Sequence, residues 1–366
     1  MPKTILCAVG TRPEAIKMAP VIRALQAYAE FDVRVLATAQ HRGMLDQIFA
    51  CFDIRPDIDL DVMRPNQSLA SLTARLLNDI DAVLVNEKPA LVLAQGDTTT
   101  VMTVALACFY RHIPFGHVEA GLRTGDLNNP FPEEMNRIVA GRLASLHFSP
   151  TVSARDNLLR EHIPQDTIWV TGNTVIDALR SVADTRPALA VALDDTKRLI
   201  LVTAHRRENF GAPLENICRA ILQLVDDNDD IQVLFPVHPN PHVQQTVRAF
   251  LQGHSRIVLC EPLDYIPFVA AMQRAYLILS DSGGVQEEAP ALGKPVLVLR
   301  KETERPEAVD AGVVKLVGTA TADIVGLAQR LLDDADAYRA VARGVSPYGD
   351  GAAAQRIVDV VLARLG

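Results

Sequence analysis

Short apolar runs alternate with longer amphipathic stretches along most of the chain. Lys3–Val9 is an apolar run that predicts a buried strand, and Pro13–Ala29 and Leu69–Val85 carry apolar residues at helical spacing. Further strands are predicted at Val33–Thr38, Ala90–Ala94, Pro114–Val118, Ser145–Phe148 and Thr167–Val170. Nearly continuous apolar strands between helices indicate a parallel sheet that is covered on both faces.

The alternation breaks at Ala183–Thr196 and then starts again. The second half predicts strands at Leu199–Val202, Ile231–Phe235, Ile257–Leu259, Leu277–Leu279 and Val296–Leu299, with helices at Pro213–Val225 and His242–Leu251. The fold class is therefore α/β, with two doubly wound Rossmann-like domains and a boundary within residues 172–197. We place the N-terminal domain at residues 1–175 and the C-terminal domain at residues 176–350. Residues 351–366 form a last helix that can belong to either domain, and we place it against the first.

Composition narrows the class of protein. The chain has 366 residues, which favours two domains, and its net charge of −8 argues against a nucleic-acid or anionic-membrane partner. The five cysteines are scattered and form no CxxC pair, so a reducing compartment is expected. The apolar stretch near residue 5 is too short to predict a signal peptide, and no apolar run approaches the roughly 18 residues of a membrane helix. We therefore expect a cytoplasmic protein that contacts no membrane.

Polar and small residues come directly after most of the predicted strands. Ligands of open parallel sheets bind beyond the carboxyl ends of the strands, so these segments are the candidate site. They are Gly10–Glu14, Gln95–Thr100, His117–Arg123, Pro132–Glu134, Ala204–Asn209, Pro236–Pro239 and Ser280–Gly284. Polar residues of solvent-exposed loops need no particular position relative to the strands. Their regular placement here therefore favours binding of a common ligand.

Ser282-Gly283-Gly284 precedes the segment Val285–Ala289, which contains Glu287 and Glu288. Small residues at a helix start let a phosphate approach the backbone N–H groups, although the same residues also suit a tight capped turn. Glu287 and Glu288 can accept hydrogen bonds from ribose hydroxyls. The sequence has no GxGxxG after the first strand and no GxxxxGK[ST], so a dinucleotide cofactor and a P-loop are disfavoured.

Three cations are candidate anion ligands. Arg12 and Lys17 flank the start of the first predicted helix, where cations oppose the helix dipole. An anion bound there would explain them, whereas two solvent-exposed charges would be the simpler alternative. Arg305 is the third candidate, with a surface salt bridge as its alternative.

Asp97, Glu119, Glu133 and His205 are the candidates for proton transfer. Three of the four have a structural alternative: Asp97 as the N-cap of the next helix, Glu133 as a first-turn acid, and His205 as a core or capping residue. Several carboxylates and a histidine together at strand ends favour acid–base chemistry. The nine histidines form no HxH or HExxH pattern, so no metal is expected.

Long motifs of the sequence resemble one family. They are GTRPEAIKMAP, QGDTTT, HVEAGLRTGD, PFPEEMNR, VTGNTVIDAL, TAHRREN, FPVHPNP, SDSGGVQEEAPALGKPVLVLR and TERPEAV. Together they resemble the non-hydrolysing UDP-N-acetylglucosamine 2-epimerases from about residue 5 to about residue 320. The resemblance implies a glycosyltransferase-B-like fold, an active site in the interdomain cleft, a nucleotide-binding C-terminal domain and no cofactor. It also implies a homodimer, and UDP-GlcNAc and UDP-ManNAc as the two ligands.

The resemblance assigns roles to individual residues. Asp97, Glu119, Glu133 and His205 match catalytic positions, and Arg12 and Lys17 match diphosphate-binding positions. Further UDP-sugar contacts are implied for Phe268 (uracil), Ser282, Gly283 and Gly284 (phosphate), Glu288 (ribose) and Arg305 (nucleotide).

The same resemblance implies elimination of UDP to 2-acetamidoglucal, re-addition, and a role in making cell-envelope polysaccharide precursors. Some relatives use a second UDP-GlcNAc as an activator near Gln40–Arg42 and Met63–Gln67. Gly43 and Asn66 stand where longer polar or basic side chains are expected, so a weak or absent effector site is predicted.

Three other functions remain as alternatives. A glycosyltransferase of the same fold would need one base and an acceptor groove instead of three acids. A hydrolysing epimerase would release UDP and the free sugar, and the sequence has no room for the added kinase domain of bifunctional enzymes. A binding regulator without turnover would not need the acid–base set.

Overall fold

The computed structural model describes residues 2–38, 42–64, 66–303 and 305–365, with no side-chain description for residues 42–44. Two compact units make up the chain. The first unit is Met1–Ala178 with Tyr348–Gly366, and the second is Leu179–Pro347. The chain therefore leaves the first unit after residue 178 and returns to it at residue 348.

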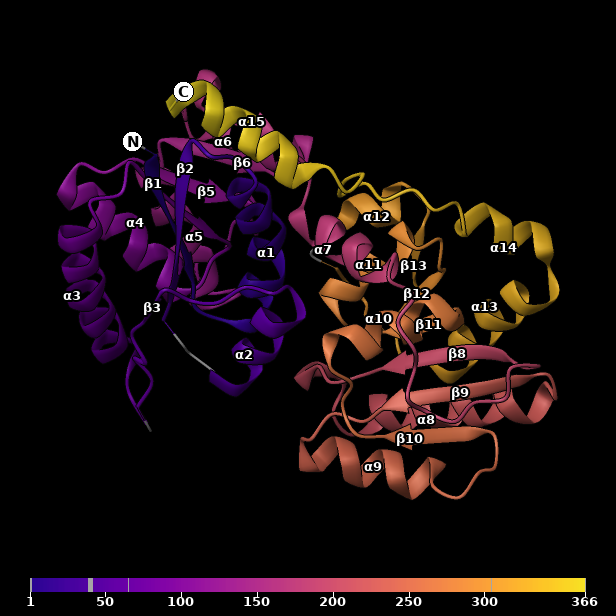
Figure 1. Cartoon of the computed structure of the whole chain (residues 1–366). Coiled ribbons are helices and arrows are strands. Elements are labelled where there is room, and N and C mark those ends of the chain that lie inside the picture. The colour runs from indigo at the N-terminus through magenta and orange to yellow at the C-terminus, as the bar shows by residue number, and fades with distance from the viewer. Residues whose placement is uncertain (1, 39–41, 65, 304, 366) are drawn as a thin grey trace. The chain divides into compact units, whose positions relative to one another are not determined.

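A parallel sheet of seven strands forms the centre of the first unit, in the order β3-β2-β1-β4-β5-β6-β7. Its strands are β1 (Lys3–Val9), β2 (Phe31–Ala37), β3 (Ile58–Asp59), β4 (Leu91–Gln95), β5 (Phe115–Val118), β6 (Leu146–Ser149) and β7 (Ile168–Val170). Its helices are α1 (Arg12–Gln26), α2 (Arg42–Cys51), α3 (Leu69–Glu87), α4 (Thr99–Arg111), α5 (Glu133–Leu143), α6 (Val152–Arg160), η1 (Gln165–Thr167) and α15 (Ala353–Leu365) (Figure 1). Helix α7 (Thr174–Ala183) begins in this unit.

The second unit repeats this architecture with six parallel strands in the order β10-β9-β8-β11-β12-β13. Its strands are β8 (Arg198–Thr203), β9 (Ile231–Pro236), β10 (Ile257–Cys260), β11 (Ala275–Ser280), β12 (Val296–Val298) and β13 (Val314–Leu316). Its helices are η2 (Arg207–Asn209), α8 (Ala212–Asp227), α9 (Pro241–Leu251), α10 (Tyr265–Arg274), α11 (Gly283–Ala291), α12 (Pro306–Asp310), α13 (Thr321–Asp333) and α14 (Ala335–Val341).

Burial of the central strands explains their continuous apolar character. In β1 the last five residues are all buried, and every residue of β4 and β5 is buried. Leu6, Leu76 and Val104 belong to one apolar core in the first unit, and Val202, Ile221 and Leu277 belong to another in the second. These two cores hold the strand ends in place, because packed interiors resist displacement.

The predicted strands are confirmed, with ends that differ by at most two residues. The strands β3 and β13 were not predicted. Both are short and lie at sheet edges, so an apolar run of two or three residues gives too little pattern to recognise. Because strand order reverses between β1 and β4, and again between β8 and β11, each sheet has a switch point where ligands of such folds bind.

The returning chain ends in α15, which packs against α1. The Asp177 carboxylate accepts hydrogen bonds from the backbone N–H groups of Ala353 (3.2 Å) and Ala354 (2.8 Å), which start this helix. Within the described ranges, no helix is both long and apolar enough to cross a membrane.

Candidate active site

The turn after β1 is organised by a buried carboxylate, Glu14. Its Oε2 accepts hydrogen bonds from the backbone N–H groups of Gly10 (2.5 Å) and Thr11 (2.7 Å), and its Oε1 accepts one from the Thr98 hydroxyl. Only 2% of Glu14 is exposed, and burial raises its pKa to about 7, with a smaller raising effect from Asp97. Glu14 thereby ties the end of β1 to the residues that follow β4.

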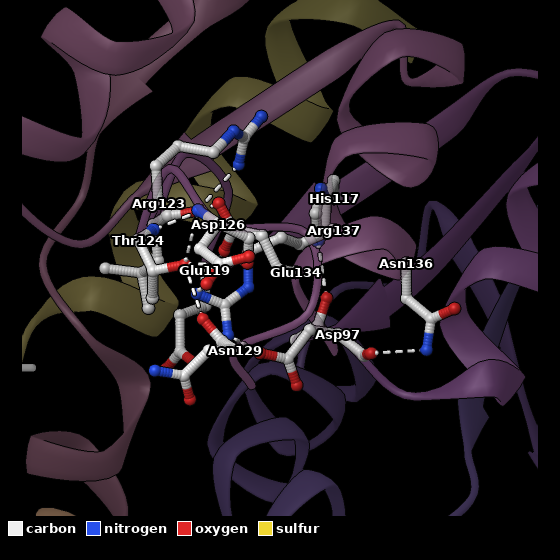
Figure 2. Close-up of polar contacts among 12 residues, drawn as sticks. Asp97, His117, Glu119, Arg123, Thr124, Asp126, Asn129, Glu134, Asn136 and Arg137 are labelled. Carbon is white, nitrogen blue, oxygen red and sulfur yellow. Dashed lines mark hydrogen bonds and ion pairs between the residues drawn. The ribbon is translucent and has the colours of Figure 1, made fainter. Parts of the chain in front are cut away.

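Asp97 follows β4 and Gly96, which has a positive φ of 89°. Its Oδ2 accepts a hydrogen bond from Nη2 of Arg137 (2.5 Å), and its backbone carbonyl accepts one from Nδ2 of Asn136 (2.9 Å) (Figure 2). Thr98 is the N-cap of α4, with its hydroxyl accepting from the N–H of Val101 at 3.3 Å. The capping alternative for Asp97 is therefore wrong, and its side chain is available for another role.

Glu119 follows β5 and is held from two sides. Its Oε2 accepts hydrogen bonds from Nζ of Lys17 (2.5 Å) and from Nδ2 of Asn173 (2.7 Å). Its φ of 65° is left-handed, which is uncommon outside glycine and marks positions where structure constrains the backbone. The alternative that Lys17 is a solvent-exposed charge is wrong, because its side chain is largely buried in this ion pair.

Helix α5 brings acidic residues and their partners to the same edge of the sheet. Glu133 is its first residue, and its side chain has no hydrogen-bonded or ionic partner among the described residues. Glu134 is fully buried, and its Oε1 accepts from the backbone N–H groups of Thr124 and Gly125, each at 3.0 Å. Arg137 lies 3.3 Å from Glu134 and also binds Asp97, so it links the loop at 124–125 to the end of β4.

Two further polar residues brace the loop after β5. Nε2 of His117 lies 2.7 Å from the carbonyl oxygen of Gly96, and burial lowers the His117 pKa to about 3. His117 is therefore neutral at pH 7 and donates this hydrogen bond. Arg123 makes a bidentate ion pair with Glu161 (2.7 and 2.8 Å). Both residues fix backbone near Asp97 and Glu119 and belong to the support of the site.

In the second unit, a buried aspartate organises the turn after β8. Asp281 is fully buried after β11, and its Oδ2 accepts hydrogen bonds from the backbone N–H groups of His205 and Arg206, both at 2.9 Å. Nδ1 of His205 lies 3.2 Å from Oδ1 of Asp281, and the imidazole stacks on His238 with ring centroids 5.6 Å apart. Burial lowers the His205 pKa, which outweighs the raising effect of Asp281. The His205 side chain is 38% exposed, so His205 is an oriented side chain at the switch point and not a core histidine.

The start of α11 is open to an approaching group. Ser282 occupies the N-cap position, but its side chain makes no capping hydrogen bond within the described part of the chain. A Cβ added at Gly283 would lie 3.7 Å from Nη2 of Arg206, and one added at Gly284 would lie 3.9 Å from Oγ of Ser282. Neither glycine is therefore required by its neighbours or by a positive φ.

Helices α10, α11 and α12 hold the remaining candidates. The buried Glu287 accepts a hydrogen bond from Nε of Arg305, so the surface-salt-bridge alternative for Arg305 is wrong and Glu287 is engaged by a cation. The Tyr265 hydroxyl lies 3.3 Å from Oε1 of Glu288. Phe268 is half-buried three residues after Tyr265, on the same face of α10.

The structure therefore gathers the candidates in two groups. Arg12, Lys17, Asp97, Glu119 and Glu133 belong to the first unit. His205, Phe268, Ser282, Gly283, Gly284, Glu288 and Arg305 belong to the second. Arg12 is the first residue of α1, and it has no side-chain partner in the described ranges.

Several residues of the site were not among the predicted ones. Arg137 and Asn173 lie outside the predicted segments, whereas the others lie inside them but were given no role of their own: Glu14, Glu134, Arg206 and Asp281. Glu14 had a readable signal, because Thr11 and Glu14 form a capping box. Glu134 contacts residues that are only 9 and 10 positions away, Gly125 and Thr124. The remaining residues depend on contacts across 40 or more positions, such as Arg137 with Asp97 and Asp281 with Arg206, which local patterns do not encode.

Two expectations concern other sites. Among the described residues, no group of three or more His, Cys, Asp or Glu side chains is placed to hold a metal ion. In the predicted effector segments, Gln40, His41 and Pro65 lie outside the described residues, and Arg42 and Gly43 are described only by their place in α2.

The fold and the site define a class of protein: a two-unit Rossmann-like α/β protein whose polar side chains gather at the switch point of each parallel sheet. A family model described as UDP-N-acetylglucosamine 2-epimerase matches residues 23–362. The chain is 54% identical over 364 residues to a UDP-N-acetylglucosamine 2-epimerase of Yersinia pestis, which covers 97% of each chain. The chain belongs to the UDP-N-acetylglucosamine 2-epimerase family, and its activity is that of an epimerase, an isomerase.

Solved structures agree in fold. A crystal structure of UDP-GlcNAc 2-epimerase from Neisseria meningitidis bound to UDP-GlcNAc superimposes with a TM-score of 0.89 and 46% identity, covering 98% of this chain and 100% of that one. The glycotransferase of kitacinnamycin is 10% identical with a TM-score of 0.67, covering 100% of both chains. The latter likeness concerns the fold alone, which is glycosyltransferase-B-like.

Proposed function

We propose that the chain interconverts UDP-N-acetylglucosamine and UDP-N-acetylmannosamine by inversion at C2 of the sugar. The observation that carries the proposal is the arrangement of Asp97 and Glu119 at the ends of adjacent strands. Each has one carboxylate oxygen bound to a cation, Arg137 or Lys17, and its other oxygen without a partner in the described part of the chain. Two oriented carboxylates with one open oxygen each are suited to proton transfer and to stabilising positive charge.

The chemistry explains why several acids are needed. The C2 hydrogen is not adjacent to a carbonyl, so direct deprotonation is unfavourable. Weakening of the C1–O bond makes C1 oxocarbenium-like and acidifies C2–H. UDP then leaves with the bonding electron pair, and a carboxylate takes the C2 proton to give 2-acetamidoglucal. A proton returned to the opposite face of C2 as UDP adds back to C1 completes the inversion.

We assign the roles as follows. Asp97 and Glu133 act near C2, because two faces of the sugar require two proton carriers. Glu119 stabilises positive charge at C1, and His205 assists the leaving diphosphate. The geometry supports an orienting contact for His205 from Asp281 and for Glu119 from Lys17, while Glu133 is unpartnered among the described residues.

The nucleotide would be held mainly by the second unit. The open start of α11 presents backbone N–H groups and the positive end of its dipole, which suit a phosphate. We propose Ser282, Gly283, Gly284, Arg12, Lys17 and Arg305 as the ligands of the diphosphate and nucleotide. Glu288, oriented by Tyr265, would accept from the ribose, and Phe268 would contact the uracil.

Incubation with UDP-GlcNAc in deuterated water tests the proposed reaction. We expect deuterium at C2 of both recovered sugar nucleotides, because the proton removed exchanges with solvent before it is returned. Mass spectrometry and proton NMR of the separated products measure it. Accumulation of free UDP without incorporation at C2 would contradict the proposal and favour hydrolysis or transfer to an acceptor.

Substitution of Gly283 by valine tests the phosphate site. The site tolerates a Cβ within the protein, so folding is retained, but the branched side chain blocks approach to the N–H groups of α11. We expect UDP affinity, measured by titration calorimetry, to fall by about 100-fold or more, equivalent to about 2.7 kcal/mol. Gly326→Val is the matched control, because Gly326 also lies in a helix with open space around it. Unchanged UDP affinity in Gly283→Val would show that the diphosphate does not bind at the start of α11.

The proposal also covers the oligomeric state of the protein, its location and the use of its product. We propose a homodimer, a cytoplasmic location and use of the product in cell-envelope polysaccharide precursors. Phe109 and Tyr110 on α4 are 57% and 60% exposed, and a second copy of the chain would cover such aromatic side chains.

A further inference from the structure

Asn173 lies between β7 and α7, and both ends of its side chain are engaged. Nδ2 donates to Oε2 of Glu119 at 2.7 Å, while Oδ1 accepts from the backbone N–H of Val175 at 3.1 Å. The backbone N–H of Val175 can only donate, so the amide oxygen faces α7 and the amide nitrogen faces Glu119. Asn173 is 3% exposed, and its side chain therefore has a defined orientation.

The backbone of Asn173 is fixed by the returning chain. Its N–H donates to the carbonyl oxygen of Tyr348 at 2.6 Å. Gly172 and Gly349 both have positive φ angles, 90° and 139°, and a Cβ on Gly349 would lie 3.5 Å from the N atom of Asn173. Asn173 thus lies where the chain returns to the first unit, near the point at which it leaves.

Glu119 depends on such support, because its backbone is in a left-handed conformation and its side chain is long. Lys17 alone would bind either carboxylate oxygen, since an ammonium group has no fixed direction. The additional donor from Asn173 selects Oε2 and leaves Oε1 without a partner among the described residues.

We infer that Asn173 is a positioning residue that directs Oε1 of Glu119 toward the substrate. This inference rests on the proposed role of Glu119. It adds a function for the junction formed by Gly172, Asn173, Tyr348 and Gly349: the returning chain segment holds the residue that aligns a catalytic carboxylate.

Two substitutions separate alignment from folding. Asn173→Asp keeps the oxygen that caps α7 and the backbone contact with Tyr348, but replaces the donor to Glu119 with an anion. Asn173→Ser also provides a capping oxygen and is too short to reach Glu119. We expect kcat to fall about 100-fold in both variants, because small misplacements of catalytic groups have effects of that size. KM, UDP affinity and the thermal unfolding midpoint should change little.

Asn216→Asp is the matched control. It adds the same charge on α8 and keeps the oxygen that accepts from Arg219 at 3.0 Å, so full activity is expected. The variant Glu119→Gln distinguishes failure of the proposed role of Glu119 from failure of the positioning role of Asn173. If Glu119→Gln is fully active, the proposed role of Glu119 is wrong. If Glu119→Gln is inactive while Asn173→Asp and Asn173→Ser both retain wild-type kcat, the positioning role of Asn173 is wrong.

A double-mutant cycle supplies a readout that a purely structural role would not give. If Asn173 acts through Glu119, the variant with both Asn173→Ser and Glu119→Gln loses no more kcat than Glu119→Gln alone. The low activities of these variants can be measured as deuterium incorporation at C2, because the label accumulates over long incubations. Independent, multiplicative losses would overturn the inference.

Discussion

Asp97→Asn is expected to abolish deuterium incorporation at C2 while UDP still binds. Asparagine has the size of aspartate and keeps an oxygen that accepts from Arg137, so the local contacts of β4 and α5 survive. It lacks the basicity that proton removal requires. Loss of a general base reduces rates by about 10² to 10⁴-fold, and we expect a loss of at least 10³-fold. Exchange at C2 and UDP affinity are measured on the same preparation.

Asp81→Asn is the control for this substitution. Asp81 also pairs with an arginine, Arg111, through two hydrogen bonds of 2.5 Å, but it lies on α3 and is exposed. Its replacement should leave exchange unchanged. If Asp97→Asn instead loses UDP binding in proportion to its loss of exchange, Asp97 serves the structure of the site and not the proton transfer.

Gly121→Ala is expected to give the largest loss of stability in the first unit. Gly121 has a φ of 95°, and a Cβ at this position would overlap the backbone carbonyl of Ala154 at the start of α6. Backbone strain costs about 1–2 kcal/mol and overpacking about 1–3 kcal/mol or more. Since backbone cannot move aside as a flexible side chain can, we expect a loss of more than about 4 kcal/mol in the free energy of unfolding.

Gly125→Ala isolates the strain from the overlap. Gly125 has a similar φ of 83°, but no atom lies within 4 Å of an added Cβ. Its loss should be about 1–2 kcal/mol. The single tryptophan, Trp169, lies on β7, so urea unfolding followed by its fluorescence reports the first unit. Equal losses in the two variants would show that the contact with Ala154 relaxes.

Much of the fold follows from local pattern. The apolar runs Lys3–Val9 and Ile231–Phe235 predict β1 and β9 because buried parallel strands need apolar side chains on both faces. The edge strands β3 and β13 escaped prediction because they are short and bury less. Helix ends depend on capping residues, which the sequence predicts less well. The N-cap of α4 is Thr98 and not Asp97, because the Thr98 hydroxyl is the side chain that reaches the N–H of Val101.

The site was predictable where chemistry follows a strand directly. Asp97, Glu119 and His205 stand at such positions, and so does the glycine turn at the start of α11. The residues that orient these side chains were harder to predict from the sequence. Arg137 reaches Asp97 from a helix 40 positions away, and Asp281 reaches the turn at Arg206 across 75 positions. No periodicity carries that information, because it arises from how strands are ordered in the sheet.

The sequence by itself determined the alternation of strands and helices, the placement of polar residues at strand ends and the family to which the chain belongs. These follow from local burial and from residue types, which a linear pattern contains. The tertiary structure alone decided which donor meets which carboxylate: Lys17 and Asn173 on Glu119, Arg137 on Asp97, and Asp281 on the turn at His205. Side chains far apart in sequence meet only after the parallel strands order themselves, and that ordering selects the orientation of each reactive oxygen and nitrogen.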